Sequence, residues 1–269
     1  MKDPCQLIAF DVGNTAVKCA VGTGEVWDIL FRSPTRPIPT LPDRLAESLT
    51  AAGESIPAGP RRWVASSVCP EADEALAQDC RRRGVPGPEI FGLHLPIPIP
   101  TLVRSPELAG TDRLLCALGA REIVGAPCIV IGAGTAITVD LVDARGRFAG
   151  GAIAPGFELA ARVLHEGAAC LPLVEPAAPA RAVGRDTREA IQSGIDAFCR
   201  GGVAALVDGM SRELQPPHDE GVPVVVTGGA SERLVPLGGP GKGAWGLPAR
   251  RVPELIFVGM AAALRIGPV

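Results

Sequence analysis

The chain has 269 residues, of which 47% are apolar and 20% charged, with 33 glycines, 27 prolines and a formal net charge of -3. This composition is typical of a globular α/β protein with many tight turns and excludes a coiled coil or a disordered chain. The slightly acidic balance gives no attraction to nucleic acid or to anionic lipid. No apolar stretch approaches the ~18 residues of a membrane span, and the first ten residues lack a signal-peptide core. We therefore expect a cytoplasmic protein with no nucleic-acid or membrane partner.

The eight cysteines are scattered and form no Cys-x-x-Cys pair, which argues against a zinc site or a disulfide framework. We expect reduced thiols that pack as small apolar side chains. The three histidines, His94, His165 and His218, lie in unrelated contexts and are interpreted as surface or loop residues. Neither residue type supplies a candidate centre for chemistry.

The first half of the chain alternates short apolar runs with turns and amphipathic segments. Its pattern predicts strands at 6–10, 16–21 and 62–68, helices at 41–52, 70–83 and 105–124, and proline-rich connections at 34–42 and 90–103. The first two strands, joined by the turn Asp11 to Thr15, should form a hairpin.

The second half begins with another pair of strands and continues with longer helices. We predict strands at 128–132, 136–142 and 222–226, a hairpin turning at Arg145 and Gly146, a glycine-rich bend at 150–156, and helices at 157–167, 187–212 and 253–266. Strands followed by helices, twice over, indicate an α/β fold.

The two halves resemble each other at their first strands. Residues 8–18, I-A-F-D-V-G-N-T-A-V-K, match residues 129–138, I-V-I-G-A-G-T-A-I-T, with Gly13 opposite Gly134 and a gap at Asn14. A strand, glycine turn, strand unit that recurs after about half the chain predicts a duplicated α/β domain. The alternative is a chance likeness of short apolar strands. We expect two similar halves, residues 1–115 and 116–269, with a cleft between them.

The turn from Asp11 to Thr15 is the first candidate for chemistry. An aspartate at the end of a buried strand can hold a hydrated magnesium ion, while the amides of a glycine turn and the Thr15 hydroxyl meet phosphate oxygens. Lys18 could add a positive charge toward the phosphates. The alternative is an ordinary hairpin turn, because Asp, Gly and Asn are common turn residues.

Two further clusters point in the same direction. Gly132 to Ala136 has small residues in the same context, and Thr135 is its candidate phosphate donor. The turn Thr227-Gly228-Gly229 lets a ligand such as adenosine approach the backbone. In Gly110-Thr111-Asp112-Arg113, a carboxylate could accept a hydroxyl proton and a guanidinium could hold an anionic acceptor. The alternative for this last cluster is a helix N-cap.

Six motifs, D-V-G-N-T, G-T-D-R, G-T-A-I-T-V-D, G-G-A-I-A-P-G, G-R-D-T and T-G-G, occur in the order and spacing of the type III pantothenate kinases. The chain resembles this family over nearly its whole length, with S-S-V at 66–68 and A-A-C-L-P at 168–172 adding to the likeness. The resemblance implies two ribonuclease-H-like halves of the actin and hexokinase type and a homodimer. It also implies ATP-dependent phosphorylation of pantothenate to 4'-phosphopantothenate, the first step of coenzyme A biosynthesis.

The resemblance implies roles for individual residues as well. ATP and magnesium would be bound by Asp11, Val12, Gly13, Asn14, Thr15, Ala16, Val17, Lys18 and Thr135, with Asp11 as the magnesium ligand. Pantothenate would be held by Gly110, Thr111, Asp112, Arg113 and Thr187. Asp112 would be the general base, and Arg113 would face the pantothenate carboxylate.

Two positions depart from the family pattern. Gly132 stands where the family usually carries an aspartate associated with a monovalent cation, potassium or ammonium, and glycine offers no side-chain ligand. Val103 stands where the pattern has a tyrosine, and this chain contains no tyrosine. Three hypotheses follow: an active pantothenate kinase, a catalytically weak or silent homologue that binds nucleotide or pantothenate as a regulatory protein, and a kinase of the same fold with another hydroxylated acceptor.

Overall fold

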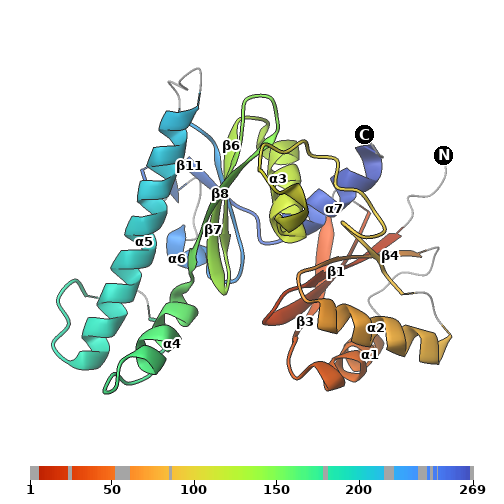
Figure 1. Ribbon diagram of the computed structural model, residues 1–269, viewed down its shortest axis with the longest axis horizontal. Coiled ribbons are helices and arrows are strands. Elements are labelled where there is room, and N and C mark those ends of the chain that lie inside the picture. Colours follow the sequence, from red (N-terminus) through yellow and green to blue (C-terminus); the bar gives the residue numbers. More distant parts are fainter. Residues whose placement is uncertain are drawn as a thin grey trace. The chain divides into compact units, whose positions relative to one another are not determined.

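The computed structural model describes residues 6–23, 26–51, 61–84, 87–177, 181–214, 221–235, 241–242, 245–246 and 248–266 (Figure 1). Its contacts divide the chain into two compact units. Unit 1 comprises Met1–Ile99, Ser105–Ile123 and Glu254–Val269, and unit 2 comprises Pro100–Arg104 and Val124–Pro253. The predicted boundary between residues 115 and 116 concerns the duplicated halves and stays a prediction.

Unit 1 contains a five-stranded sheet in the order β3-β2-β1-β4-β5. Its strands are β1 (Gln6–Val12), β2 (Ala16–Gly22), β3 (Trp27–Pro34), β4 (Arg61–Ser67) and β5 (Glu89–Ile90). Its helices are α1 (Leu41–Ala51), α2 (Pro70–Arg83), α3 (Thr111–Val124) and α7 (Leu255–Ile266), with short 3-10 turns at Ile38–Thr40 and Pro106–Leu108. Strands β1, β2 and β3 are antiparallel, whereas β4 pairs parallel with β1.

The alternation of β1 separates a core face from a polar face. Ile8, Phe10 and Val12 belong to the apolar core that includes Leu41 and Leu45 of α1. Because successive strand residues point to opposite sides of a sheet, Asp11 faces away from this core. Helix α2 begins with Pro70 and ends at Gly84, whose φ of 67° is the left-handed conformation that closes many helices.

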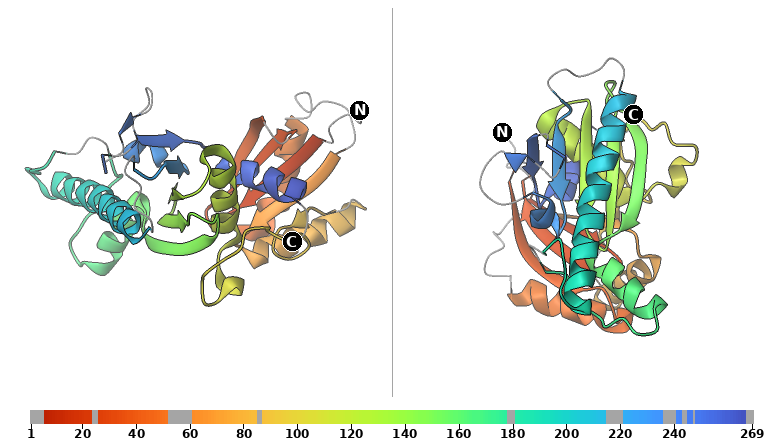
Figure 2. Two further views of the ribbon diagram at one scale, coloured as in Figure 1. Left: turned by 90° about the horizontal axis from the view of Figure 1, so that it is seen from above. Right: turned by 90° about the vertical axis from the view of Figure 1, so that its left-hand side faces the viewer.

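Unit 2 contains a six-stranded sheet in the order β10-β11-β9-β6-β7-β8. Its strands are β6 (Cys128–Ala133), β7 (Ala136–Val142), β8 (Phe148–Pro155), β9 (Val224–Thr227), β10 (Gly241–Lys242) and β11 (Pro248–Arg251). Its helices are α4 (Phe157–Gly167), α5 (Thr187–Glu213) and α6 (Ser231–Leu234), and the long α5 beside α4 is plain in Figure 2. Side chains from β6, β7, β9, α4 and α5 form one apolar core.

The two sheets share one topology, which confirms the predicted fold class. In each unit the first three strands form an antiparallel meander, and the fourth pairs parallel with the first. The repeat in the sequence has a matching geometry: the Gly13 amide donates to Ala16 at 3.0 Å, and the Gly134 amide donates to Ala136 at 3.0 Å. In each hairpin the amide of the turn glycine donates to the carbonyl of the alanine that begins the next strand. The turn of the second hairpin is one residue shorter.

Most predicted elements are present, and two predictions are wrong in part. The helix expected at 105–124 begins only at Thr111, because Pro106–Leu108 forms a separate 3-10 turn. The bend expected at 150–156 is strand β8 as far as Pro155. Gly151 is glycine because a Cβ there would overlap the Val139 carbonyl of the neighbouring strand. Strand β3 was not predicted, because a register shift opposite Cys19 and Ala20 breaks its alternation.

The side chains expected to be inert have ordinary environments. Exposed His94 accepts the Ile90 amide at 2.9 Å, and exposed His165 lies 2.7 Å from the Leu171 carbonyl. Seven cysteines of the described residues are free of disulfides. Cys5, His218 and the last residue of the helix predicted at 41–52 lie outside the described residues.

Candidate functional site

An ion pair lies beside the glycine turn that joins β1 to β2. Lys18 Nζ lies 3.2 Å from Asp11 Oδ2, and the two side chains are 25% and 18% exposed. Asn14 and Thr15 are exposed at the tip of the turn, and the Thr35 hydroxyl donates to the Gly13 carbonyl at 2.6 Å. The polar groups predicted to meet phosphate therefore lie together and are accessible.

Two members of the predicted nucleotide segment have a structural role. Val12 and Val17 are paired across the hairpin and buried, so they could offer a ligand only main-chain atoms. Their packing fixes the hairpin on the core, which leaves Asp11 and Lys18 on the opposite face.

A row of polar residues crosses the unit 1 sheet at the level of Asp11. Asp11 is paired in register with Lys18 on β2 and with Ser66 on β4, and Lys18 is paired with Arg32 on β3. Directly paired residues of neighbouring strands project from the same face. Arg32 was not predicted as a site residue, because it lies in β3, whose alternation is irregular. Ser66 belongs to the S-S-V segment of the family resemblance, and its position at the end of an apolar strand is the signal that could have assigned it to the site.

The environment of Asp11 raises its pKa above the ordinary value for a carboxyl. Burial is the largest cause, because removal from water disfavours the charged form. The charge and hydrogen bond of Lys18 and the charge of Arg32 act in the opposite direction, while the negative charge of Asp112 raises the pKa further. Asp112, predicted as a separate cluster, is thus electrostatically coupled to Asp11 within unit 1.

Hydrogen bonds join the first residue of α3 to the end of β4. The Thr111 hydroxyl donates to the Ser67 carbonyl at 3.2 Å and lies 3.1 Å from the Ser66 hydroxyl, which is buried. Gly92, with a φ of 84°, lies against the Thr111 methyl group: a Cβ on Gly92 would stand 2.8 Å from Thr111 Cγ2. These contacts hold the first turn of α3, and with it Asp112, against the sheet.

The Asp112 side chain is hydrogen-bonded to the backbone in the first turn of α3. Its Oδ1 accepts the Arg113 amide at 2.9 Å, and a Cβ at Gly110 would lie 2.5 Å from the same oxygen. Glycine at 110 therefore leaves room for the carboxylate in this rotamer. The helix-capping interpretation and the catalytic interpretation are compatible, because the second carboxylate oxygen is not used in this contact.

The corresponding turn of unit 2 has no carboxylate. Gly132 is paired in register with Thr138, and a Cβ at Gly132 would lie 2.7 Å from the Thr138 hydroxyl. Thr135 is exposed at the tip of the turn, and its carbonyl accepts the Gly156 amide at 2.9 Å. Gly228, with a φ of 94°, passes so close to the Ala133 backbone that only glycine fits, so packing alone explains that residue.

Two other predicted positions also lie in unit 2. Thr187 is the exposed first residue of α5, and Asp186 caps this helix by accepting the Glu189 amide at 2.9 Å. Val103 is half-buried in a segment that runs beside β8, and its Cγ1 would lie 3.4 Å from a Cβ on Gly150. Nothing polar is supplied by the Val103 side chain.

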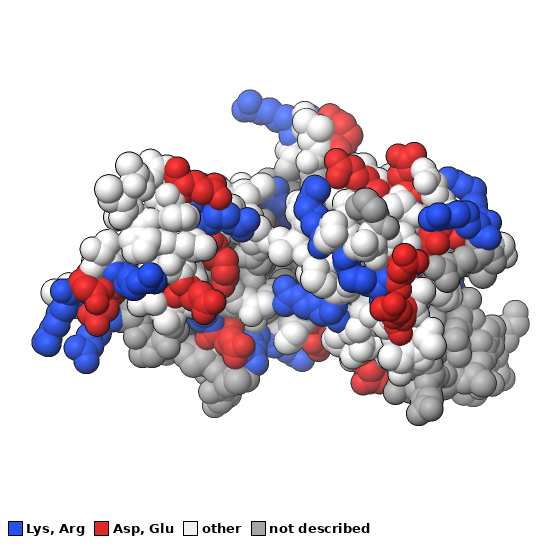
Figure 3. All heavy atoms as spheres, turned by 90° about the horizontal axis from the view of Figure 1, so that it is seen from below, with Lys and Arg blue, Asp and Glu red and all other residues white. Residues whose placement is uncertain are grey.

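Charged side chains of both signs are interspersed over the face shown in Figure 3. Among the described helices, none combines the length and apolar character needed to cross a membrane. The described residues also hold no cluster of three or more His, Cys, Asp or Glu side chains that could enclose a metal ion.

The repeated topology, with a glycine turn after the first strand of each sheet, defines a duplicated α/β protein with the ribonuclease-H-like strand order. A family model described as type III pantothenate kinase matches residues 7–212. The chain belongs to the type III pantothenate kinase family.

Similar proteins agree with this assignment. The type III pantothenate kinase of Phenylobacterium zucineum is 37% identical over 228 residues, covering 84% of this chain and 87% of that protein. That of Maricaulis maris is 38% identical over 227 residues, covering 83% and 86%. Among solved structures, a Baf family protein of Campylobacter jejuni is similar in fold, with a TM-score of 0.58 and 17% identity over 96% of this chain and 98% of that one.

Proposed function

We propose that this protein transfers the γ-phosphoryl group of ATP to the primary alcohol of pantothenate, yielding 4'-phosphopantothenate in the first step of coenzyme A biosynthesis. Membership of the type III pantothenate kinase family supports the reaction. The observation that carries the mechanism is geometric. Asp11, which is paired with Lys18, is in register with Ser66 of β4, and the Ser66 hydroxyl lies 3.1 Å from that of Thr111, the residue before Asp112. A phosphoryl transfer site needs this combination of a metal-binding carboxylate, a cation and a second carboxylate.

In this proposal Asp11 holds magnesium, with Lys18 directed at the phosphates. The residues fit such an ion, because Asp11 Oδ2 lies on the polar face of the sheet and its partner Lys18 is a quarter exposed. Bound magnesium would neutralise charge on the phosphates. The amides of Asn14 and Thr15, and Thr135 of unit 2, are proposed as further nucleotide contacts. The Gly13 amide already donates to Ala16, so Gly13 is proposed to contribute by leaving the backbone of the turn open to the phosphates.

Asp112 is the proposed general base. A carboxylate can accept the hydroxyl proton as the oxygen attacks phosphorus, while positioning supplies most of the remaining rate enhancement. Arg113 is proposed to pair with the pantothenate carboxylate through its planar guanidinium, and Thr187 to contact the acceptor. Gly110 is proposed to matter through its lack of a side chain, and Thr111 through the position of Asp112.

A potassium or ammonium ion fits the unit 2 turn poorly. Gly132 carries no oxygen ligand, and the Thr138 hydroxyl occupies the direction that a side chain at 132 would take. The proposed mechanism therefore contains no step that uses a monovalent cation. The same position, together with Val103, supports the rival candidates of a silent binding protein and of a kinase with a different acceptor.

A homodimer is part of the proposal. Unit 2 exposes large apolar side chains, among them Ile153 at 64%, Phe198 at 68% and Val183 at 76%. Where such side chains adjoin one another, they form the contiguous apolar surface that is typical of subunit interfaces. We also propose a cytoplasmic location, which suits seven described cysteines without a disulfide. Light scattering coupled to gel filtration would give the mass of the particle.

The decisive experiment combines turnover with binding. ADP release is measured with pantothenate and with a panel of other hydroxylated acceptors, and a nonhydrolysable ATP analogue is titrated by calorimetry. Pantothenate-dependent ADP release with formation of phosphopantothenate supports the proposal. Binding without turnover would establish the silent homologue, and turnover only with another acceptor would establish the other kinase.

A further inference from the structure

We propose that unit 1 contains a second binding site, an apolar cavity between the sheet and helices α1 and α2 that takes a small uncharged aromatic molecule. The cavity has a volume of about 110 Å³. Its walls are formed by Phe10, Pro42, Leu45, Ala46, Leu49, Trp63, Leu76, Asp79, Cys80 and Pro88. This proposal does not depend on the kinase reaction.

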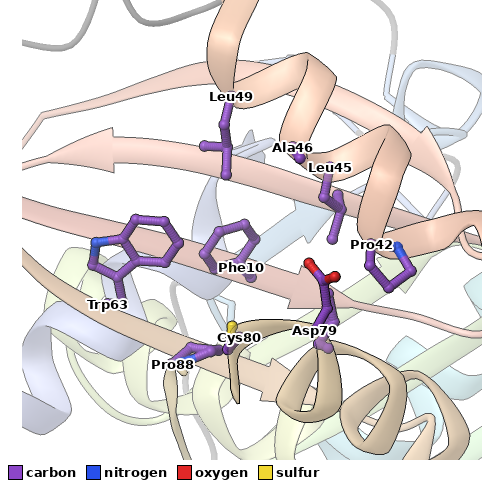
Figure 4. A pocket seen from close by; sticks show the side chains of 10 residues that line it. Phe10, Pro42, Leu45, Ala46, Leu49, Trp63, Asp79, Cys80 and Pro88 are labelled. Atoms are coloured by element: carbon purple, nitrogen blue, oxygen red, sulfur yellow. The ribbon is translucent and has the colours of Figure 1, made fainter. Parts of the chain in front are cut away.

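Figure 4 shows how the walls are arranged. Phe10 of β1 and Trp63 of β4 form the floor, and Leu45 and Leu49 of α1 approach from one side. Cys80 of α2 approaches from the other side. The described lining residues come from two strands, two helices and Pro88, so the cavity is a feature of the layer between sheet and helices.

The cavity is separate from the candidate kinase site. Phe10 precedes Asp11 in the same strand, and neighbouring strand residues project from opposite faces of a sheet. Asp11 and Lys18 belong to the polar face of the sheet, whereas Phe10 belongs to the apolar core that includes Leu45. A ligand in this cavity would therefore contact none of the residues proposed to bind ATP.

The size of the cavity limits the ligand to a single ring or a group of similar volume. An engineered apolar cavity of about 150 Å³ in another protein stays dry and binds benzene, so a space of about 110 Å³ admits one six-membered ring with little to spare. The rings of Phe10 and Trp63 are 5.8 Å apart at their centroids and tilted by 37°. Aromatic rings favour tilted and offset contacts at such distances, so a third ring could pack against this pair.

The lining chemistry selects an uncharged ligand. Asp79 is the one ionisable carboxylate among the lining residues, and Arg82 lies 3.6 Å from its Oδ1. An anionic ring would be repelled by this carboxylate, and a cationic ring would have to compete with Arg82 for it. Either ion would also lose hydration against the apolar part of the wall. A neutral ring replaces water on apolar walls and gains free energy in proportion to the area buried.

Fluorobenzene serves as the probe, because fluorine resonances report its binding to the full-length protein directly, while Trp63 fluorescence reports from the wall. We expect saturable binding with a matching change of fluorescence that is lost in Trp63→Phe. Benzylamine and benzoate, which carry opposite charges on a similar ring, should bind at least tenfold more weakly. Absence of saturable binding would overturn the proposal, and tighter binding of either ion would overturn the assignment to uncharged ligands.

Variants that fill the cavity test its location. Ala46→Leu places a larger side chain in the wall from α1, and Cys80→Leu does so from α2, so the second replaces the first if the first does not fold. Either should weaken fluorobenzene binding at least tenfold. Ala77→Leu, on α2 but outside the wall, is the matched control and should bind as the wild type does. Unchanged affinity in the folded filling variants would place the probe elsewhere and refute the site.

Discussion

The negative charge of Asp112, in the first turn of α3, raises the pKa of Asp11 at the end of β1. Two residues that the sequence presents as separate motifs are therefore parts of one electrostatic system in unit 1. Their different settings suit different tasks: Asp11 is paired with Lys18, whereas Asp112 Oδ1 is held by the backbone at a helix start. This division of roles leads to the first prediction.

Asp112→Asn should lower kcat by about 100- to 10,000-fold, because the proton acceptor is removed while no nucleotide contact is lost. Affinity for an ATP analogue, measured by calorimetry, should change by no more than a few-fold. Glu107→Gln removes an exposed carboxylate from the turn just before α3 and should leave kcat unchanged. Near-normal turnover in the Asp112 variant would show that another group accepts the proton.

The pH dependence of magnesium nucleotide binding should report the pKa of Asp11. A raised pKa means that the carboxylate is protonated, and binding weakened, at a higher pH than for an ordinary aspartate. Asp112→Asn removes a charge that raises this pKa, so the acid midpoint of binding should move to lower pH. Lys18→Met removes a charge that lowers it, so the midpoint should move to higher pH.

Calorimetric titrations of a magnesium ATP analogue across the acid range would measure both midpoints. The opposite directions are the test, because a general loss of affinity cannot produce them. Movement of both midpoints in the same direction would contradict the proposed role of Asp11 as the group that titrates.

The hydrogen bonds of Thr111 with Ser66 and Ser67, which join α3 to β4, should be required for catalysis but not for nucleotide binding. Thr111→Val keeps the shape of the side chain but leaves the buried Ser66 hydroxyl without this partner, which should cost about 1 to 2 kcal/mol of unfolding free energy. The displaced Asp112 should reduce kcat, with KM for ATP little changed. Thr111→Ser retains the hydroxyl and should restore most of kcat. Equal losses in both variants would assign the effect to the methyl contact with Gly92.

How much the sequence could predict depends on whether the signal is local. The turn residues Gly13 and Gly134 and the apolar strands around them identify the two hairpins, because strand and turn preferences act over a few residues. Strand β3 carries Arg32 on the polar face, yet its alternation is broken by a register shift opposite Cys19 and Ala20. An irregular strand of this kind gives a weak periodic signal.

The candidate site was predictable in its residues but not in its contacts. Asp11, Lys18 and Asp112 stand out as charged residues beside glycine turns. Their coupling depends on the pairing of β1 with β4 and on the hydrogen bond between Thr111 and Ser66, which join segments far apart in the chain. Local preferences carry no information about such pairings. Likewise, the Thr138 hydroxyl beside Gly132 becomes evident only from the register of β6 and β7.

Restoring an acid at 132 should create or strengthen stimulation by potassium. Gly132→Asp supplies an oxygen ligand, but its Cβ would stand 2.7 Å from the Thr138 hydroxyl, so the Thr138 side chain must rotate. The double variant Gly132→Asp with Thr138→Ala tests whether this crowding limits the single one. Initial rates in potassium and in sodium chloride at equal ionic strength give the comparison, with the Thr138→Ala variant as control. An unchanged ratio of rates in both aspartate variants would show that the position has no part in cation dependence.

Helix α7 should hold α3 in place through a glycine contact that tolerates no side chain. A Cβ at Gly259 would overlap the Leu115 carbonyl oxygen of α3, and a Cβ at Gly119 would lie 2.6 Å from the Leu255 carbonyl oxygen of α7. Gly259→Ala should therefore destabilise the protein by about 1 to 3 kcal/mol, because backbone must move to admit the methyl group. Gly209→Ala is the matched control: Gly209 is an exposed residue of α5 with open space around it, and the substitution should stabilise the protein by about 0.5 to 1 kcal/mol. Thermal and denaturant unfolding would measure both, and a Gly259 variant as stable as the wild type would show that the two helices are not packed backbone to backbone.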